Sequence, residues 1–188
     1  MKTIEEVFAP VIGQYMWNMD CGWGSITSMQ FGLPHLCVRE PMADTSHYTD
    51  KTVRDNLACR AIKPEGQWHL WIEYTRWVAT MKDAKVTSED DYATMAKVFR
   101  RISGQKLVSL SHTPNDELNL NFDLGGCVSI AMSPEILYGE PWMLVDSTTG
   151  IIWVYRENGI IEPSPTSICE VGGIDVWQNR KKTKPPSP

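Results

Sequence analysis

Apolar residues recur at helical spacing between residues 88 and 103, with polar residues between them. The positions that would share the buried side of a helix are Tyr92, Met95, Ala96, Phe99 and Ile102. Ser88 is a favourable N-cap residue, and Asp91 follows three residues later in the capping-box position. Gly104 follows the last apolar position, where a helix-ending glycine is expected. The pattern predicts a helix that begins after Ser88 and ends before Gly104.

A shorter version of this pattern stands at the N-terminus. Thr3 and Glu6 have the spacing of a capping box, and Pro10 is expected to end the helix. The apolar positions that would share one face are Ile4, Val7 and Phe8. A third, short helix is predicted around residues 53–59.

Alternation of apolar and polar residues predicts the strands. In residues 118–122, Leu118, Leu120 and Phe122 alternate with two asparagines, which is typical of a half-buried strand. Further strands are predicted at 66–74, 127–132, 139–147 and 150–158. The segments 66–74 and 139–147 place tryptophan and leucine alike, and we interpret them as equivalent strands of two similar units.

One pattern occurs twice at an offset of 91 residues. Residues 13–31 and 104–122 both begin with Gly-Gln and end with Phe, and their apolar positions coincide. Two diverged copies indicate a duplicated supersecondary unit with approximate two-fold symmetry. We therefore predict that residues 3–32 and 94–123 superpose, each as a helix followed by a β-hairpin.

The predicted fold class is α+β, with helices packed on a mostly antiparallel sheet. Two pseudo-symmetric helix-plus-antiparallel-hairpin units, about residues 3–87 and 88–160, would pack as one domain that spans residues 1–179. The length of 188 residues suits such a domain. Residues 180–188 are rich in Lys and Pro, and we expect them to be disordered.

Charge is unevenly distributed along the chain. The net charge is −5, but residues 1–179 hold 14 of the 18 basic residues and all 23 acidic ones, a net charge of −9. An acidic body disfavours binding to nucleic acid and suits a basic protein partner. No apolar run is long enough to span a membrane, and the N-terminus does not resemble an export signal. The expected location is the cytoplasm.

Candidate chemistry is sparse. The five cysteines are widely spaced, which favours reduced, mostly buried thiols over a disulfide framework or a metal site. No phosphate-binding loop, dinucleotide fingerprint, zinc-protease motif or nucleophile-elbow motif is present. A cysteine–histidine pair remains open, because residues distant in sequence can meet in space. We expect no cofactor, no metal and no catalytic activity.

The eight tryptophans are the unusual feature of the composition. Most fall on predicted strands, where they would be core residues, but Trp23 lies between two glycines at a predicted hairpin tip. An exposed tryptophan there would suit a protein interface, whereas a tip that folds back would bury it. His69 and Glu73 share one strand face with Trp71, which either faces a second layer or solvent or lines a ligand pocket.

The stretches "GQYMWNMDCGWGSITSMQFG" at 13–32, "VREP" at 38–41 and "GQWHLWIEYTRW" at 66–77 support a family comparison. The chain resembles a set of uncharacterised bacterial proteins, a domain of unknown function with the order Gly-Gln, Trp, Gly-x-Gly-Ser, Phe-Gly, Val-Arg-Glu-Pro and Gly-Glu-Trp-His-Leu-Trp-Ile. Gln67 replaces the usual Glu, and Trp23 replaces a residue that is often smaller or polar. Small acidic bacterial proteins of this kind are often associated with toxin immunity or phage defence, and the resemblance implies such a role by analogy.

These observations predict a non-catalytic, protein-binding bacterial protein. Its leading form is the immunity protein of a toxin–antitoxin pair, which would cover the active site of a basic toxin. The functional face is predicted around Trp23 and the non-repeated segment 33–65. The candidate partner-binding residues are Trp23, Arg39, Asp44, Asp50, His69, Trp71 and Glu73. The alternative is a small-ligand-binding protein or enzyme with a pocket around His69, Arg39 and Trp71; the oligomeric state is left open.

Overall fold

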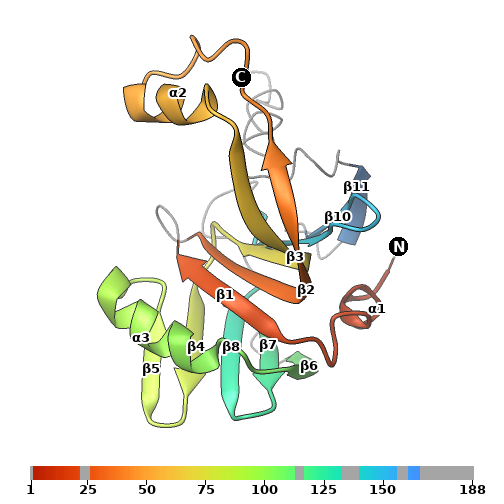
Figure 1. Cartoon of the computed structure of the whole chain (residues 1–188). Helices are drawn as coiled ribbons and strands as arrows, with labels where there is room; N and C mark the ends of the chain where they lie inside the picture. The colour runs from red at the N-terminus through yellow and green to blue at the C-terminus, as the bar shows by residue number, and fades with distance from the viewer. Residues whose placement is uncertain (1, 22–25, 113–116, 133–139, 156–160, 166–188) are drawn as a thin grey trace, which may run out of the picture.

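The structure is a computed structural model, and it describes residues 2–21, 26–112, 117–132, 140–155 and 161–165 (Figure 1). Within these residues the chain forms eleven strands in two antiparallel sheets, together with three short helices. The helices are α1 (Ile4–Phe8), α2 (Lys51–Leu57) and α3 (Tyr92–Ile102). Among the described residues, none of these helices has the length and apolar character needed to cross a membrane.

The larger sheet has six strands. In spatial order they are β1 (Met16–Cys21), β2 (Thr27–Arg39), β3 (Ala61–Ile72), β9 (Trp142–Asp146), β10 (Ile151–Tyr155) and β11 (Ile161–Pro165). The smaller sheet has five strands, in the order β5 (Ala84–Thr87), β4 (Trp77–Met81), β8 (Gly126–Ala131), β7 (Glu117–Phe122) and β6 (Leu107–His112). Each neighbouring pair within a sheet is antiparallel.

The predicted α+β fold class is wrong, because the fold is mostly β. The three helices have only 5, 7 and 11 residues, whereas strands account for about half of the chain. Helix-plus-hairpin units do not describe the architecture either, since each copy contributes a three-stranded meander, β1–β2–β3 or β6–β7–β8. Short helices lack the stability to organise a fold alone, so the extended strands define the layers.

Local signals in the sequence were read correctly in several places. Thr3 and Glu6 form a capping box at the start of α1, as predicted. The longer helix begins later than predicted, since Asp91 is its N-cap residue and its carboxylate accepts a hydrogen bond from the backbone N–H of Thr94. Gly104 follows α3 with a φ of +89°, the left-handed conformation expected of a helix-ending glycine. The short helix predicted around 53–59 is α2.

The offset of 91 residues also relates backbone hydrogen bonds in three dimensions. The N–H of Gly13 donates to the carbonyl of Leu107, and the N–H of Gly104 donates to that of Met16, both at 2.7 Å. Between them, Tyr15 and Lys106 form an isolated antiparallel bridge. Reciprocal contacts of this kind are the mark of an approximate two-fold axis, which passes beside that bridge.

The last strands of each half pair with the sheet of the other half: β4 and β5 belong to the smaller sheet, and β9, β10 and β11 belong to the larger one. Strand β4 follows β3 along the chain but pairs with β8, and β9 follows β8 but pairs with β3. Trp77 therefore lies opposite Ile130, and Trp142 lies opposite Ile72. The interpretation of 66–74 and 139–147 as equivalent strands is wrong, because they are β3 and its neighbour β9.

One hydrophobic core joins both sheets and the helices α1 and α3. Its aromatic contacts follow the same symmetry. Phe8 of α1 packs edge-on against Trp142 with ring centroids 5.3 Å apart, and Phe99 of α3 packs against Trp77 at 5.5 Å. Phe8 and Phe99 differ by 91 residues, so the repeated apolar positions are those that build the core.

Gln105 shows how the turn after α3 is fastened. Its side chain is almost fully buried, and its Nε2 donates to the carbonyl of Arg101 at 2.8 Å. Its Oε1 accepts from the backbone N–H of Gly126 at 3.0 Å, at the start of β8. The corresponding Gln14 is only half-buried, so the repeated Gly-Gln pair supports the second half more tightly.

Candidate functional site

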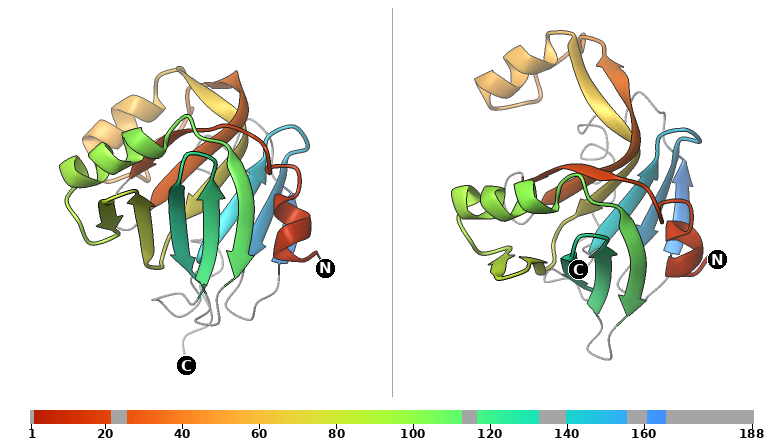
Figure 2. Two further views of the ribbon diagram at one scale, coloured as in Figure 1. Left: turned by 90° about the horizontal axis from the view of Figure 1, so that it is seen from below. Right: turned by 60° about the horizontal axis from the view of Figure 1, so that its bottom comes forward.

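The largest departure from the two-fold symmetry is an arm formed by residues 33–65. In the second half, β7 passes to β8 through the short turn between Phe122 and Gly126. In the first half, β2 and β3 continue for 13 and 12 residues and carry α2 at their far end. Figure 1 and the right view of Figure 2 show this arm standing away from the rest of the molecule. Beyond the irregular pairing between Phe31 and Pro34, β2 pairs with β3 alone among the described strands.

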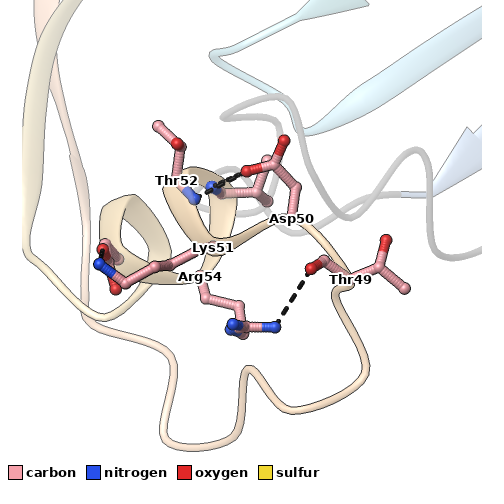
Figure 3. Close-up of polar contacts among 7 residues, drawn as sticks. Thr49, Asp50, Lys51, Thr52 and Arg54 are labelled. Carbon is pink, nitrogen blue, oxygen red and sulfur yellow. Dashed lines mark hydrogen bonds and ion pairs between the residues drawn. The ribbon is translucent and has the colours of Figure 1, made fainter.

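The helix α2 is held by side chains at its start. Asp50 is the N-cap residue, and its carboxylate accepts hydrogen bonds from the backbone N–H groups of Thr52 at 2.7 Å and Val53 at 3.2 Å. Arg54 donates to the carbonyls of Tyr48 and Thr49, which closes the preceding loop (Figure 3). A seven-residue helix is unstable alone, so these contacts and the burial of Leu57 keep it formed.

Every charged side chain of the arm has a partner within the arm. Arg39 donates to the carbonyls of Asn56 at 2.8 Å and Leu57 at 3.1 Å, which ties β2 to the end of α2. The ion pairs are Lys51–Asp55, Arg60–Glu40 and Lys63–Glu65. Asp50 and Arg54 serve α2, and Asp44 accepts from the N–H of Ser46. The segment contains five basic and five acidic residues, so the arm is neutral.

One face of the arm is apolar and exposed. Leu36 pairs with Pro64 and Val38 pairs with Ile62, so these four side chains share the face opposite Arg39 and α2. We call them the apolar strip. Leu36 is 71% exposed and Ile62 is 61% exposed. Five of the ten exposed large hydrophobic residues among the described positions belong to the arm: Leu33, Leu36, Val38, Val53 and Ile62.

A hollow of about 400 Å³ lies where the arm joins the larger sheet. Its lining contains no Asp, Glu, Lys or Arg and consists of Leu33, Pro34, His35, Gln67, Ser147 and Thr148. Leu33 is 78% exposed at its edge. An apolar strip that runs toward an uncharged hollow is suited to apolar side chains of another surface.

A second hollow, of about 390 Å³, lies between β1 and α3. Asn18 contributes to it from an irregularity in β1, where its φ is +51°. The Tyr92 hydroxyl donates to the Asp20 carboxylate at 3.1 Å across this hollow. Strained backbone is often found at functional sites. Here the Asp20 carboxylate and the Tyr92 hydroxyl already bind each other, whereas the arm exposes contiguous aliphatic side chains, so the arm is the better candidate.

The residues predicted on β3 are mostly buried. His69 is 4% exposed and Glu73 is 2% exposed, so neither can contact a partner in this conformation. The indole N–H of Trp71 donates to Nδ1 of His69 at 3.0 Å. Burial first, and then the positive charge of Lys63, lower the pKa of His69 to about 3, so the ring is neutral at physiological pH.

These residues lie on the outer face of the larger sheet, next to a second buried apolar cluster. Trp71 packs against a buried cluster on the outer face of the larger sheet, formed by Met143, Val145, Ile152 and Val154. The opposite side of β3, with Trp68, Leu70 and Ile72, faces the main core. His69 is therefore a buried residue of the sheet's outer face and does not face solvent.

The structure does not bring the predicted pocket residues together. Arg39 pairs with Ala61 far out on the arm, whereas His69 lies opposite Gln30 in the body of the sheet. Eight residues of β3 separate these positions, about 26 Å at 3.3 Å per residue. Of the other predicted partner-binding residues, Asp44 and Asp50 stabilise loops of the arm, and Trp23 lies outside the described residues.

The exposed apolar residues of the arm are a candidate surface that sequence reasoning missed. The signal was present in the alternation of Leu36, Cys37 and Val38 and of Ile62, Lys63 and Pro64. Alternation shows that two faces differ in polarity, but it does not show which of them another element covers. The position of α2 settles this, since Cys37 and Arg39 face inward and the strip faces solvent.

Among the described residues, no group of three histidine, cysteine or acidic side chains is arranged to hold a metal ion. The four described cysteines, at 21, 37, 59 and 127, are all free thiols. Burial raises the pKa of the Cys127 thiol, which disfavours a reactive thiolate there.

Comparison with known proteins returned no relative: no family model matches the chain, and no curated protein or solved structure is significantly similar to it.

Proposed function

We propose that this chain is a non-catalytic protein-binding protein and that the arm is its binding surface. The observation that supports this most directly is the apolar strip, which displays aliphatic side chains on a projecting ribbon. Contiguous exposed apolar surface on an otherwise well-packed protein is typical of interaction sites. The two-fold symmetry adds weight, because the corresponding turn of the second half carries no such extension.

The internal pairing of the arm supports the same proposal. Exposed ion pairs contribute little to the free energy of unfolding, so folding stability alone does not explain why the charges of the arm balance. Because these charges are paired within the arm, a partner that binds the strip would have to remove water from few unpaired charges. Binding through this surface would be driven by apolar burial, with the largest contributions from Leu36 and Ile62.

The toxin-immunity role is a more specific proposal within this function. Outside the arm the chain holds 13 basic and 18 acidic residues, a net charge of −5. The acidic body would steer a basic partner while the arm supplies apolar anchors. The association rate would then fall as ionic strength rises, whereas dissociation from the strip would change little.

Site-specific photocrosslinking in the cells of origin tests the proposed function. A photoreactive phenylalanine derivative is placed at Leu36 or Ile62 of the arm, and at Leu124 as the control. Leu124 is 65% exposed and lies 91 residues after Leu33, in the corresponding turn of the second half. We expect polypeptide adducts from the two arm positions and not from Leu124. Equal labelling at all three positions, or no adduct at any of them, would refute the arm as the binding surface.

A further inference from the structure

We propose that the apolar strip of one copy packs face to face with the strip of a second copy, which makes the free protein a reversible homodimer. This inference rests on the proposed function of the arm and names the occupant of the strip when no other partner is bound. The first reason is exposure. Leu36 and Ile62 leave most of their surface in water, and packing them together removes that surface at no cost in hydrogen bonds.

The second reason is the distribution of charge. Two copies of this chain repel each other wherever their bodies approach, because the chain outside the arm carries a net charge of −5. The arm is neutral, six of its ten charged side chains form ion pairs and the other four bind backbone groups of the arm, and it projects from the body. It is therefore the surface on which two like-charged copies can meet with little repulsion.

The third reason is the shape of the ribbon. Both of its edges carry a proline, Pro34 on β2 and Pro64 on β3, and proline cannot donate a hydrogen bond to an added strand. Edge-to-edge pairing is therefore disfavoured, whereas the face is open. A two-fold interface needs a self-complementary patch, and a strip of uncharged aliphatic and proline side chains meets this condition. In an antiparallel arrangement, Val38 of one arm would lie near the Leu33 end of the other.

The size of the strip limits its affinity. A stable interface uses roughly 20–30 residues from each partner. The strip and the adjoining Leu33 and Pro34 supply far fewer, so we expect a dimer with a dissociation constant on the order of 10 μM. Such a dimer would form and separate readily, and a tighter-binding partner could displace the second copy.

Sedimentation equilibrium of the full chain tests this, over a concentration range from about 1 to about 500 μM. The variants are Leu36→Asp and Ile62→Asp, with Leu124→Asp as the matched control on the corresponding turn. We expect the wild type and Leu124→Asp to dimerise alike. Each arm variant should raise the dissociation constant at least about tenfold, because every dimer would bury two carboxylates. Sodium chloride should not weaken the wild-type dimer, since no ion pair would hold it.

Two results would overturn the homodimer: a wild type that stays monomeric at the highest concentration, or a dimer that survives both arm substitutions. If circular dichroism shows that Leu36→Asp is unfolded, Leu36→Thr replaces it, because threonine removes most of the apolar surface without adding a charge. The two proposals fail separately. A monomeric chain that still crosslinks another protein from Leu36 and Ile62 refutes self-association and leaves the binding function standing.

Discussion

Acidification is expected to destabilise this protein through one buried side chain, His69. The ring is 4% exposed, and its Nδ1 accepts the indole N–H of Trp71, which leaves the single proton of the neutral ring on Nε2. A second proton would have to bind at Nδ1, where it would face the Trp71 donor. Burial and this donor both oppose the charged form, and the pKa of His69 lies at about 3 in the folded state.

The magnitude follows from linkage between protonation and folding. An unfolded histidine has a pKa near 6.5, so as the pH falls the unfolded state takes up the proton before the folded state does. Stability is therefore lost below about pH 6.5, and the loss continues until about pH 3. Each pH unit within this window lowers the free energy of unfolding by about 1.4 kcal/mol. Between pH 7 and pH 5 the expected loss is about 2 kcal/mol.

Two hydrogen-bonded aspartates, Asp44 and Asp91, do not contribute to this window. Hydrogen bonds from Ser46 to Asp44 and from Thr94 to Asp91 lower the pKa of each carboxyl from 3.8. Their contributions are present above pH 3.8 and are lost only as the pH falls below it, so the difference between the wild type and a His69 variant between pH 7 and pH 5 reports on His69.

Urea denaturation of the wild type and of His69→Gln at several values between pH 7 and pH 5 measures this effect. Glutamine retains an acceptor for Trp71 and does not titrate, so the variant should lose most of the pH dependence even if its stability at pH 7 is lower. His35→Gln, at an exposed position, is the control and should behave as the wild type. The reasoning is refuted if the wild type loses less than about 0.5 kcal/mol, or if His69→Gln loses as much as the wild type does.

Five further substitutions test the scaffold and the arm. Gly104→Ala and Gly13→Ala should each lower the free energy of unfolding by about 1–2 kcal/mol, because φ is +89° and +85° at these positions; unchanged denaturation midpoints would contradict this. Gln105→Leu should lower the free energy of unfolding by about 2–3 kcal/mol, because it leaves buried backbone groups without their partner. Gln14→Leu should lower it by less than about 1 kcal/mol, because Gln14 is only half-buried. Equal losses for the two variants would refute the difference in burial. Arg39→Ala should speed amide hydrogen exchange in α2 while the melting temperature shifts by only about 2 °C, and unchanged exchange would show that Arg39 does not hold that helix.

The structure gives the positions of the predicted site residues and does not test their predicted functions. His69 and Glu73 are expected at a partner surface or a ligand pocket, but both are buried, on a strand face that carries a second apolar cluster. Arg39 was expected at the functional face and lies in the arm, where it joins β2 to α2. Its role is to hold the arm in shape, and the strip on the opposite face is the surface that a partner can reach.

The exchange of strands between the halves explains why the sequence pattern of β3 and β9 wrongly indicates equivalent strands. Strands β3 and β9 look alike in sequence because both are buried on the same sheet, with Leu70 directly opposite Leu144. Similar burial produces similar patterns in neighbours as well as in symmetry mates. The true counterpart of Trp142 is Trp77, which has a different sequence around it and is identified by its position opposite Ile130.

The sequence by itself determined the local features: the capping box at Thr3, the left-handed glycines, the half-buried alternation of β7, and the offset of 91 residues that relates Phe8 to Phe99. These depend on neighbours within a few residues or on the apolar period of a single element, so they can be read from the chain. Only the tertiary structure decided which strands pair across the two halves and which face of the arm is covered. Both depend on contacts between residues far apart in sequence, and a period-2 pattern is the same whether its apolar side meets a sheet, a helix or water.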